Sequence, residues 1–135
     1  MPDTHAPEIR ADYLRGVELF LAGEAEQAVE ALRPLVAQDP RPELLLALGK
    51  ALLELRRGQE AGECFRRLRS GGTLEDTGLD AYVRLLAAVA TALAGRPDEA
   101  LRELDDVMTA EPRLERAARS LKRRLEAGRP PVLRF

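Results

Sequence analysis

The chain has 135 residues and a net charge of −2 at pH 7, and 45% of its residues are hydrophobic and 33% charged. This balance is typical of one soluble folded domain and excludes an intrinsically disordered chain. Aromatic residues make up only 4% and Trp is absent, so the core must consist of Leu, Ala and Val, and the high helix propensity of Leu and Ala favours an all-α fold.

Seven helices are expected along the chain. Residues 1–8 contain two prolines and the only histidine, His5, and are expected to form a mobile leader. Apolar residues then recur at helical spacing, in segments separated by Gly and Pro. The expected helices span residues 9–22, 24–38, 42–57, 59–69, 79–94, 97–110 and 113–127, and residues 128–135 form a non-helical tail.

Three segments of the chain share the same kinds of residue at the same offsets. The second follows the first by 33 residues, and the third follows the second by 39. The repeated positions are Gly16, Ala28, Leu32 and Leu35, then Gly49, Ala61, Phe65 and Leu68, then Ala88, Ala100, Leu104 and Val107. A period of this size indicates stacked helical units that cannot bury their apolar faces alone. We expect units at about residues 9–41, 42–72 and 78–112, closed by a cap helix at 113–127 with a polar outer side.

These residues resemble the tetratricopeptide repeat (TPR) family, whose units are two antiparallel helices with small residues where the helices cross. The resemblance covers about residues 9–112, and the best match runs from Gly16 to Asp39-Pro40. The second unit departs from the pattern, because it lacks the closing Pro and has Arg56 where the family prefers Gly. The resemblance implies a right-handed α-solenoid of three helical hairpins plus the cap helix, as a single domain at residues 9–127.

Members of this family are partner-binding scaffolds in which the first helix of each unit lines a concave groove. Carried over unit by unit, the resemblance implies a mostly apolar groove. The groove positions that it implies are Tyr13, Val17, Phe20, Leu46, Lys50, Leu53, Tyr82, Leu86 and Val89. Some members bind carboxylate tails through a Lys, Asn and Arg clamp, but the corresponding positions here carry side chains that bind a carboxylate poorly. A co-chaperone that docks chaperone tails is therefore disfavoured.

We expect from this resemblance a non-enzymatic adaptor or assembly factor that binds an apolar or amphipathic segment of a partner protein. Self-association through the groove or the tail is a further expectation. A competing interpretation is that many of these residues are packed core, or that the ends of the chain cover them.

The basic C-terminal helix offers an alternative function. Residues 113–135 carry eight Arg or Lys residues against Glu115 and Glu126. Arg116, Arg119 and Arg123 are the candidate contacts for an acidic protein or a nucleic acid. Nucleic acid is disfavoured, because no aromatic residues interleave with the basic ones for base stacking. The other interpretation is a solvated face whose charge balances the acidic units.

No pattern in the sequence indicates catalysis, a cofactor or a metal site. His5 has no neighbouring residues for a catalytic triad or for metal coordination. Gly71-Gly72 lacks the Lys and Ser or Thr that follow a phosphate-binding loop. Cys64 lies next to Phe65 and is expected to be a small buried hydrophobe.

Several features of the sequence predict the cellular location of the protein. The first residues lack the basic start and apolar run of a secretory signal, and Cys64 alone allows no internal disulfide. The most apolar stretch, residues 85–95, is shorter than the ~20 residues of a membrane-spanning helix. We expect a cytoplasmic protein, and the excess of Arg over Lys is typical of a GC-rich, bacterial genome. The tail RPPVLRF is stiffened by two prolines, and either frays, folds back on the stack or inserts into the groove of another molecule.

Overall fold

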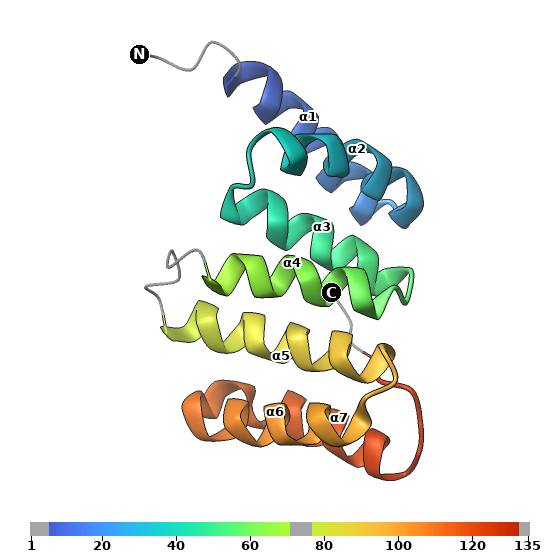
Figure 1. The fold of residues 1–135 in the computed structure, drawn as a ribbon, viewed down its shortest axis with the longest axis vertical. Helices are drawn as coiled ribbons and strands as arrows, with labels where there is room; N and C mark the ends of the chain where they lie inside the picture. The colour runs from blue at the N-terminus through green and yellow to red at the C-terminus, as the bar shows by residue number, and fades with distance from the viewer. Residues whose placement is uncertain (1–5, 71–76, 133–135) are drawn as a thin grey trace.

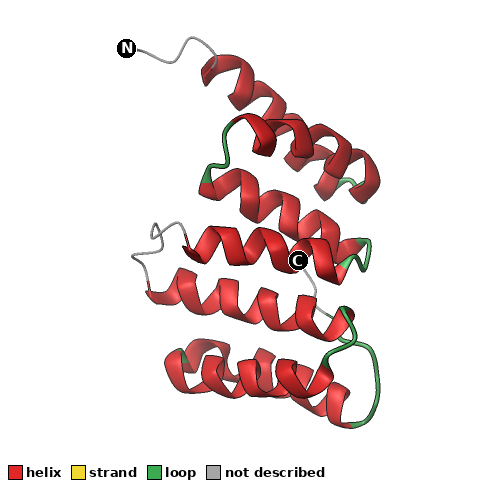
Figure 2. Ribbon diagram, in the orientation of Figure 1, coloured by secondary structure: helices red, strands yellow, loops and turns green. Residues whose placement is uncertain are grey.

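The computed structural model describes residues 6–70 and 77–132, and in this part of the chain the regular structure is entirely helical (Figure 2). Within these residues, seven α-helices and one 3-10 helix follow one another. They are α1 (Ala6–Leu21), α2 (Ala25–Gln38), α3 (Pro42–Glu54), α4 (Gly58–Ser70), α5 (Thr77–Leu93), α6 (Pro97–Ala110), η1 (Pro112–Leu114) and α7 (Glu115–Glu126). The predicted all-α class is confirmed.

The predicted helix boundaries differ from the observed ones at the start of α1, at the end of α3 and at the start of the last helix. The helix expected to reach residue 57 ends at Glu54, because the chain turns at Arg56, where φ is positive. Residues 6–8, which were expected to belong to a mobile leader, are helical, and Pro7 lies in the first turn of α1. A proline is tolerated there, because the first N–H groups of a helix have no partner within the helix. The rest of the expected leader, residues 1–5, lies outside the described residues. The last expected helix begins as the 3-10 turn η1 before α7 continues.

The turns that join an odd-numbered helix to the next even-numbered helix share one hydrogen-bond pattern. In the first turn the N–H of Gly23 donates to the Phe20 carbonyl at 3.0 Å, and the N–H of Glu24 donates to the Leu19 carbonyl at 2.9 Å. Arg56 with Arg57, and Gly95 with Arg96, make the corresponding pair of bonds in the next two such turns. This pattern places the residue after the helix in the left-handed conformation. The φ angles are accordingly +83° at Gly23, +58° at Arg56 and +86° at Gly95.

The helices pack in succession, each against the next one along the chain, from α1 at one end of the stack to α7 at the other (Figure 1). The substantial contacts between helices two apart in this order join α1 to α3, α3 to α5 and α5 to α7. The odd-numbered helices therefore approach one another along one side of the stack.

Leu, Ala and Val make up most of the core, as the composition predicts. The largest side chains with less than 2% exposure are Phe65, Leu32, Leu44, Leu52, Leu86, Leu104, Val83 and Val107. Among the described residues, no charged side chain is buried. The stack is therefore stabilised mainly by removal of aliphatic surface from water. No helix in the described part of the chain has the length and apolarity needed to cross a membrane.

Candidate functional site

The predicted groove positions lie on the odd-numbered helices, and we call them together the odd-helix surface. Within each helix the positions are three or four residues apart, a spacing that places side chains on the same side of a helix. The odd-helix surface comprises Tyr13, Val17 and Phe20 of α1, Leu46, Lys50 and Leu53 of α3, and Tyr82, Leu86 and Val89 of α5. Because α1 contacts α3 and α3 contacts α5, these positions lie on neighbouring helices.

Burial divides the predicted positions into two groups. Leu53, Leu86 and Val89 are buried at 6%, 0% and 4% exposure, and Leu86 is therefore a core residue. The other predicted positions, Tyr13, Val17, Phe20, Leu46, Lys50 and Tyr82, are partly buried. These side chains present apolar area to solvent while most of them also pack against the core.

Lys50 and Tyr82 join the middle of the odd-helix surface. The ammonium group of Lys50 on α3 lies 5.1 Å from the centroid of the Tyr82 ring on α5. A cation over an aromatic face within about 6 Å is attracted by the ring, at about 0.5–1 kcal/mol where the pair is exposed. The contact keeps the aliphatic stem of Lys50 along the surface.

The C-terminal tail reaches the same surface. Pro131 is buried, and Pro131 and Val132 line a cleft of about 150 Å³ with residues of α3, α5 and the turn after α3. The lining residues of the stack are Leu53, Glu54, Arg56, Val89 and Leu93. The tail therefore folds back on the stack over the described residues 128–132. Leu133, Arg134 and Phe135 lie outside the described residues.

The sequence left the position of the tail open, because a short proline-containing terminus gives no helical or strand period. The sequence feature that could have indicated a returning tail is the helix-ending glycine, Gly128, followed within a few residues by apolar side chains. Arg124 has an additional role that its charge alone does not indicate. Its Nε donates a hydrogen bond of 3.0 Å to the carbonyl of Pro130.

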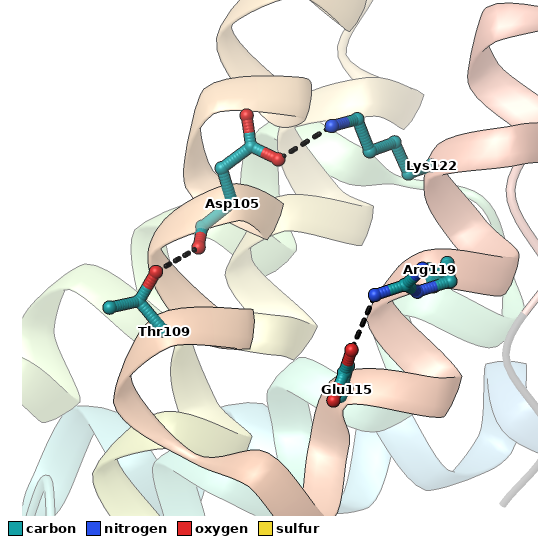
Figure 3. A network of polar contacts seen from close by, with 5 residues as sticks. All are labelled: Asp105, Thr109, Glu115, Arg119 and Lys122. Carbon is teal, nitrogen blue, oxygen red and sulfur yellow. Dashed lines mark hydrogen bonds and ion pairs between the residues drawn. The ribbon is translucent and has the colours of Figure 1, made fainter.

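The basic residues of α7 are only partly paired. Lys122 donates a hydrogen bond of 2.7 Å to the side chain of Asp105 on α6, and Arg119 pairs with Glu115 (Figure 3). The backbone carbonyl of the same Asp105 accepts a hydrogen bond of 3.1 Å from the Thr109 hydroxyl. Arg116 and Arg123 are exposed, and no ion-pair partner is found for either among the described residues. The three candidate arginines therefore differ, since Arg119 is already engaged by a carboxylate on its own helix.

Two other titratable groups have perturbed pKa values. Burial raises the pKa of the Cys64 thiol to about 11, although the nearby guanidinium groups of Arg67 and Arg33 oppose the shift. Burial likewise raises the pKa of the Glu103 carboxyl, and the nearby Thr91 hydroxyl counteracts the rise in part. The Oε1 atom of Glu103 is buried without a hydrogen-bond partner in the described structure. Both shifts have desolvation as their largest cause.

Within residues 6–70 and 77–132 no group of three or more His, Cys, Asp or Glu side chains is arranged to hold a metal ion. No protein-family model matches the chain, and no curated protein matches it significantly.

Proposed function

We propose that the chain is a non-enzymatic protein-binding module, an adaptor or assembly factor that binds an apolar or amphipathic segment of a partner protein on the odd-helix surface. The architecture that we propose is a TPR-like right-handed solenoid of three antiparallel hairpins, formed by α1 with α2, α3 with α4 and α5 with α6, and capped by α7. The shared turn geometry at Gly23, Arg56 and Gly95 supports this repeat assignment.

The observation that carries the proposal is the row of partly buried apolar and aromatic side chains on the helices that approach one another. Tyr13, Val17 and Phe20 continue on α1 the row that Leu46 and Tyr82 form on α3 and α5. Partly exposed aromatic residues are enriched in binding surfaces, because they contribute a large contact area at low entropic cost. The only cation of the odd-helix surface, Lys50, lies over the Tyr82 ring. An apolar segment therefore fits this surface better than an acidic one.

Substitution on the odd-helix surface tests this proposal. Val17→Glu and Leu46→Glu each place a carboxylate on the surface at a partly buried position. We expect either variant to lose a partner that the wild-type protein retains from a lysate of the source organism through a high-salt wash. The matched control is Ala37→Glu, which makes the same kind of change at an exposed position of the even-numbered helix α2.

The melting temperature of each variant decides how a loss is interpreted. A loss of binding with a melting temperature near that of the wild type assigns the residue to the binding surface. Equal retention by the wild type, both surface variants and the control would contradict the proposal. Leu86→Glu is unsuited to this test, since Leu86 is fully buried and a carboxylate there would destabilise the core.

An electrostatic function of α7 is the second candidate, and the unpaired state of Arg116 and Arg123 among the described residues favours it. The partner would be an acidic protein, while nucleic acid remains the less favoured ligand. Double substitution of Arg116→Glu and Arg123→Glu should abolish binding of such a partner and leave the salt-resistant partner unaffected. Its affinity should also fall steeply as the salt concentration rises. A flat salt series would exclude this candidate.

A further inference from the structure

The end of α7 is built to direct the tail back toward the odd-helix surface. Gly128 has a φ angle of +72°, which only glycine adopts readily, and it turns the chain after the last helix. The Arg129 N–H then donates to the Arg124 carbonyl at 2.8 Å. The side chain of the same Arg124 donates to the Pro130 carbonyl at 3.0 Å. Two hydrogen bonds to one residue therefore fix the direction of the chain just before Pro131.

Pro131 is the residue that enters the surface. It is buried, whereas Pro130 is exposed and Val132 is 45% exposed. The cleft shared by Pro131 and Val132 has aliphatic walls from Leu53 of α3 and from Val89 and Leu93 of α5. The tail thus buries one side chain on two of the helices that form the odd-helix surface.

The aromatic residues of the chain point to the kind of segment that this surface accepts. The sequence contains two Tyr and three Phe. Tyr13, Phe20 and Tyr82 lie partly exposed on α1 and α5, and Phe65 is in the core. Grooves lined with aromatic residues bind proline-rich segments, because the polyproline conformation is already extended and loses little entropy on binding. The two consecutive prolines of the tail favour this conformation.

We propose that the odd-helix surface binds extended segments containing a proline followed by an apolar residue, and that the chain's own tail occupies part of this surface in the free protein. The partner segment and the tail then compete for the cleft at Leu53, Val89 and Leu93. This inference rests on the proposed function and names both the ligand class and the internal competitor. The apparent affinity for a partner is reduced by the fraction of molecules in which the tail is bound.

The probe is a fluorescent peptide with the sequence of residues 129–135, RPPVLRF, titrated with the 135-residue chain. Pro131→Glu should release the tail and increase the affinity for the peptide about tenfold over the wild type, as expected when the tail occupies about nine-tenths of the molecules. Pro130→Glu is the matched control, because it adds the same charge at an exposed position and keeps the carbonyl that Arg124 binds. It should bind the peptide as weakly as the wild type. The peptide RPEVLRF should not bind.

A second variant covers the case in which Pro131→Glu perturbs the fold. Arg124→Met keeps the aliphatic stem of the side chain and removes the donor to Pro130. It should give an affinity for the peptide between those of the wild type and Pro131→Glu. Circular dichroism and thermal melting establish that each variant is folded.

Three results would overturn the inference. Equal affinity of the wild type and the released variants for RPPVLRF would show that the tail does not compete, and would leave the proposed function in place. Absence of peptide binding in every variant would exclude the ligand class, while the Val17→Glu capture experiment would still judge the proposed function separately. A wild-type dimer in sedimentation that Pro131→Glu converts into a monomer would assign the tail to a second copy of the chain.

Discussion

Gly49 of α3 lies so close to the ring of Phe65 of α4 that a Cβ atom at Gly49 would be 2.6 Å from Cε1 of the ring. Gly16 has the same relationship to Leu32, with 2.6 Å to Cδ2. The glycine and its partner are 16 residues apart in both pairs. The corresponding pair in the third repeated segment is Ala88 and Leu104, both 1% exposed. The repeat seen in the sequence is therefore also a repeat of one helix contact.

Gly49→Ala should lower the free energy of unfolding by about 1–2 kcal/mol. The added methyl group overpacks the contact with Phe65 by about 1–3 kcal/mol, which exceeds the gain in helix propensity of up to about 1 kcal/mol. Gly62→Ala on α4 is the control, because a Cβ atom at Gly62 would lie at an ordinary contact distance of 3.8 Å from the Cβ of Ala90. It should leave stability unchanged or raise it. Urea unfolding measures both variants, and a stabilised Gly49→Ala would contradict the close approach.

Arg56→Gly should raise the free energy of unfolding by about 0.5–1 kcal/mol. A residue with a Cβ atom is strained in the left-handed conformation by about 1–2 kcal/mol, and part of the gain is lost because glycine is more flexible in the unfolded chain. Arg56 has a φ angle of +58°, whereas the corresponding residues of the other two turns are Gly23 and Gly95. Arg57→Gly is the control and should give no gain. A destabilised Arg56→Gly in thermal melting would show that the Arg56 side chain contributes more than the strain costs.

Glu103→Gln should stabilise the protein at pH 7, by about 1 kcal/mol or less because the side chain is only partly buried. Burial raises the pKa of the Glu103 carboxyl above its ordinary value, so the folded protein binds this proton more tightly than the unfolded chain does. The ionised form therefore destabilises the fold at neutral pH, and this penalty disappears as the pH falls through the raised pKa.

The difference in melting temperature between Glu103→Gln and the wild type should accordingly shrink when the pH is lowered from 7 toward 4. Glu30→Gln, at an exposed position of α2, is the control for a general change in net charge. A difference for Glu103→Gln that stayed constant with pH would show that the effect is not due to ionisation of Glu103.

Cys64 should react very slowly with a thiol reagent in the native protein. The thiolate is the reactive form, and a pKa of about 11 leaves about one thiol in a thousand ionised at pH 8. The side chain is also only 6% exposed. Labelling with a chromogenic disulfide at pH 8 should be many times slower in buffer than in denaturant. Similar rates in the two conditions would mean that α4 is not packed as described.

The sequence was sufficient to predict the helices of the described part of the chain, because the signals are local and repeated. Apolar spacing located each helix, and the equivalence of Gly16 with Gly49 located the crossing points. The start of α1 was missed because the two prolines near the N-terminus were interpreted as breakers, although Pro7 occupies a first-turn position where it is tolerated.

The candidate site was predictable only as a set of positions on helices. Spacing places Leu46, Leu86 and Val89 equally on the inner sides of their helices, but exposure depends on how closely α3 and α5 pack. For that reason the sequence does not show that Leu86 is a core residue while Leu46 is partly exposed. The placement of Pro131 depends on the turn at Gly128 and on the side chain of Arg124, and neither has a periodic signal in the sequence.

The succession of helix contacts also has a kinetic consequence. The substantial contacts of the stack join helices that are at most two apart in chain order, so the loops that must close during folding are short. Proteins dominated by such local contacts fold in about microseconds to milliseconds. Stability in such an array is the sum of unit and neighbour-interface terms, and folding can begin at any unit. The first helix pair can therefore form while the C-terminal half of the chain is still being synthesised, and the tail, which follows α3 and α5 along the chain, reaches its cleft only after these two helices are in place.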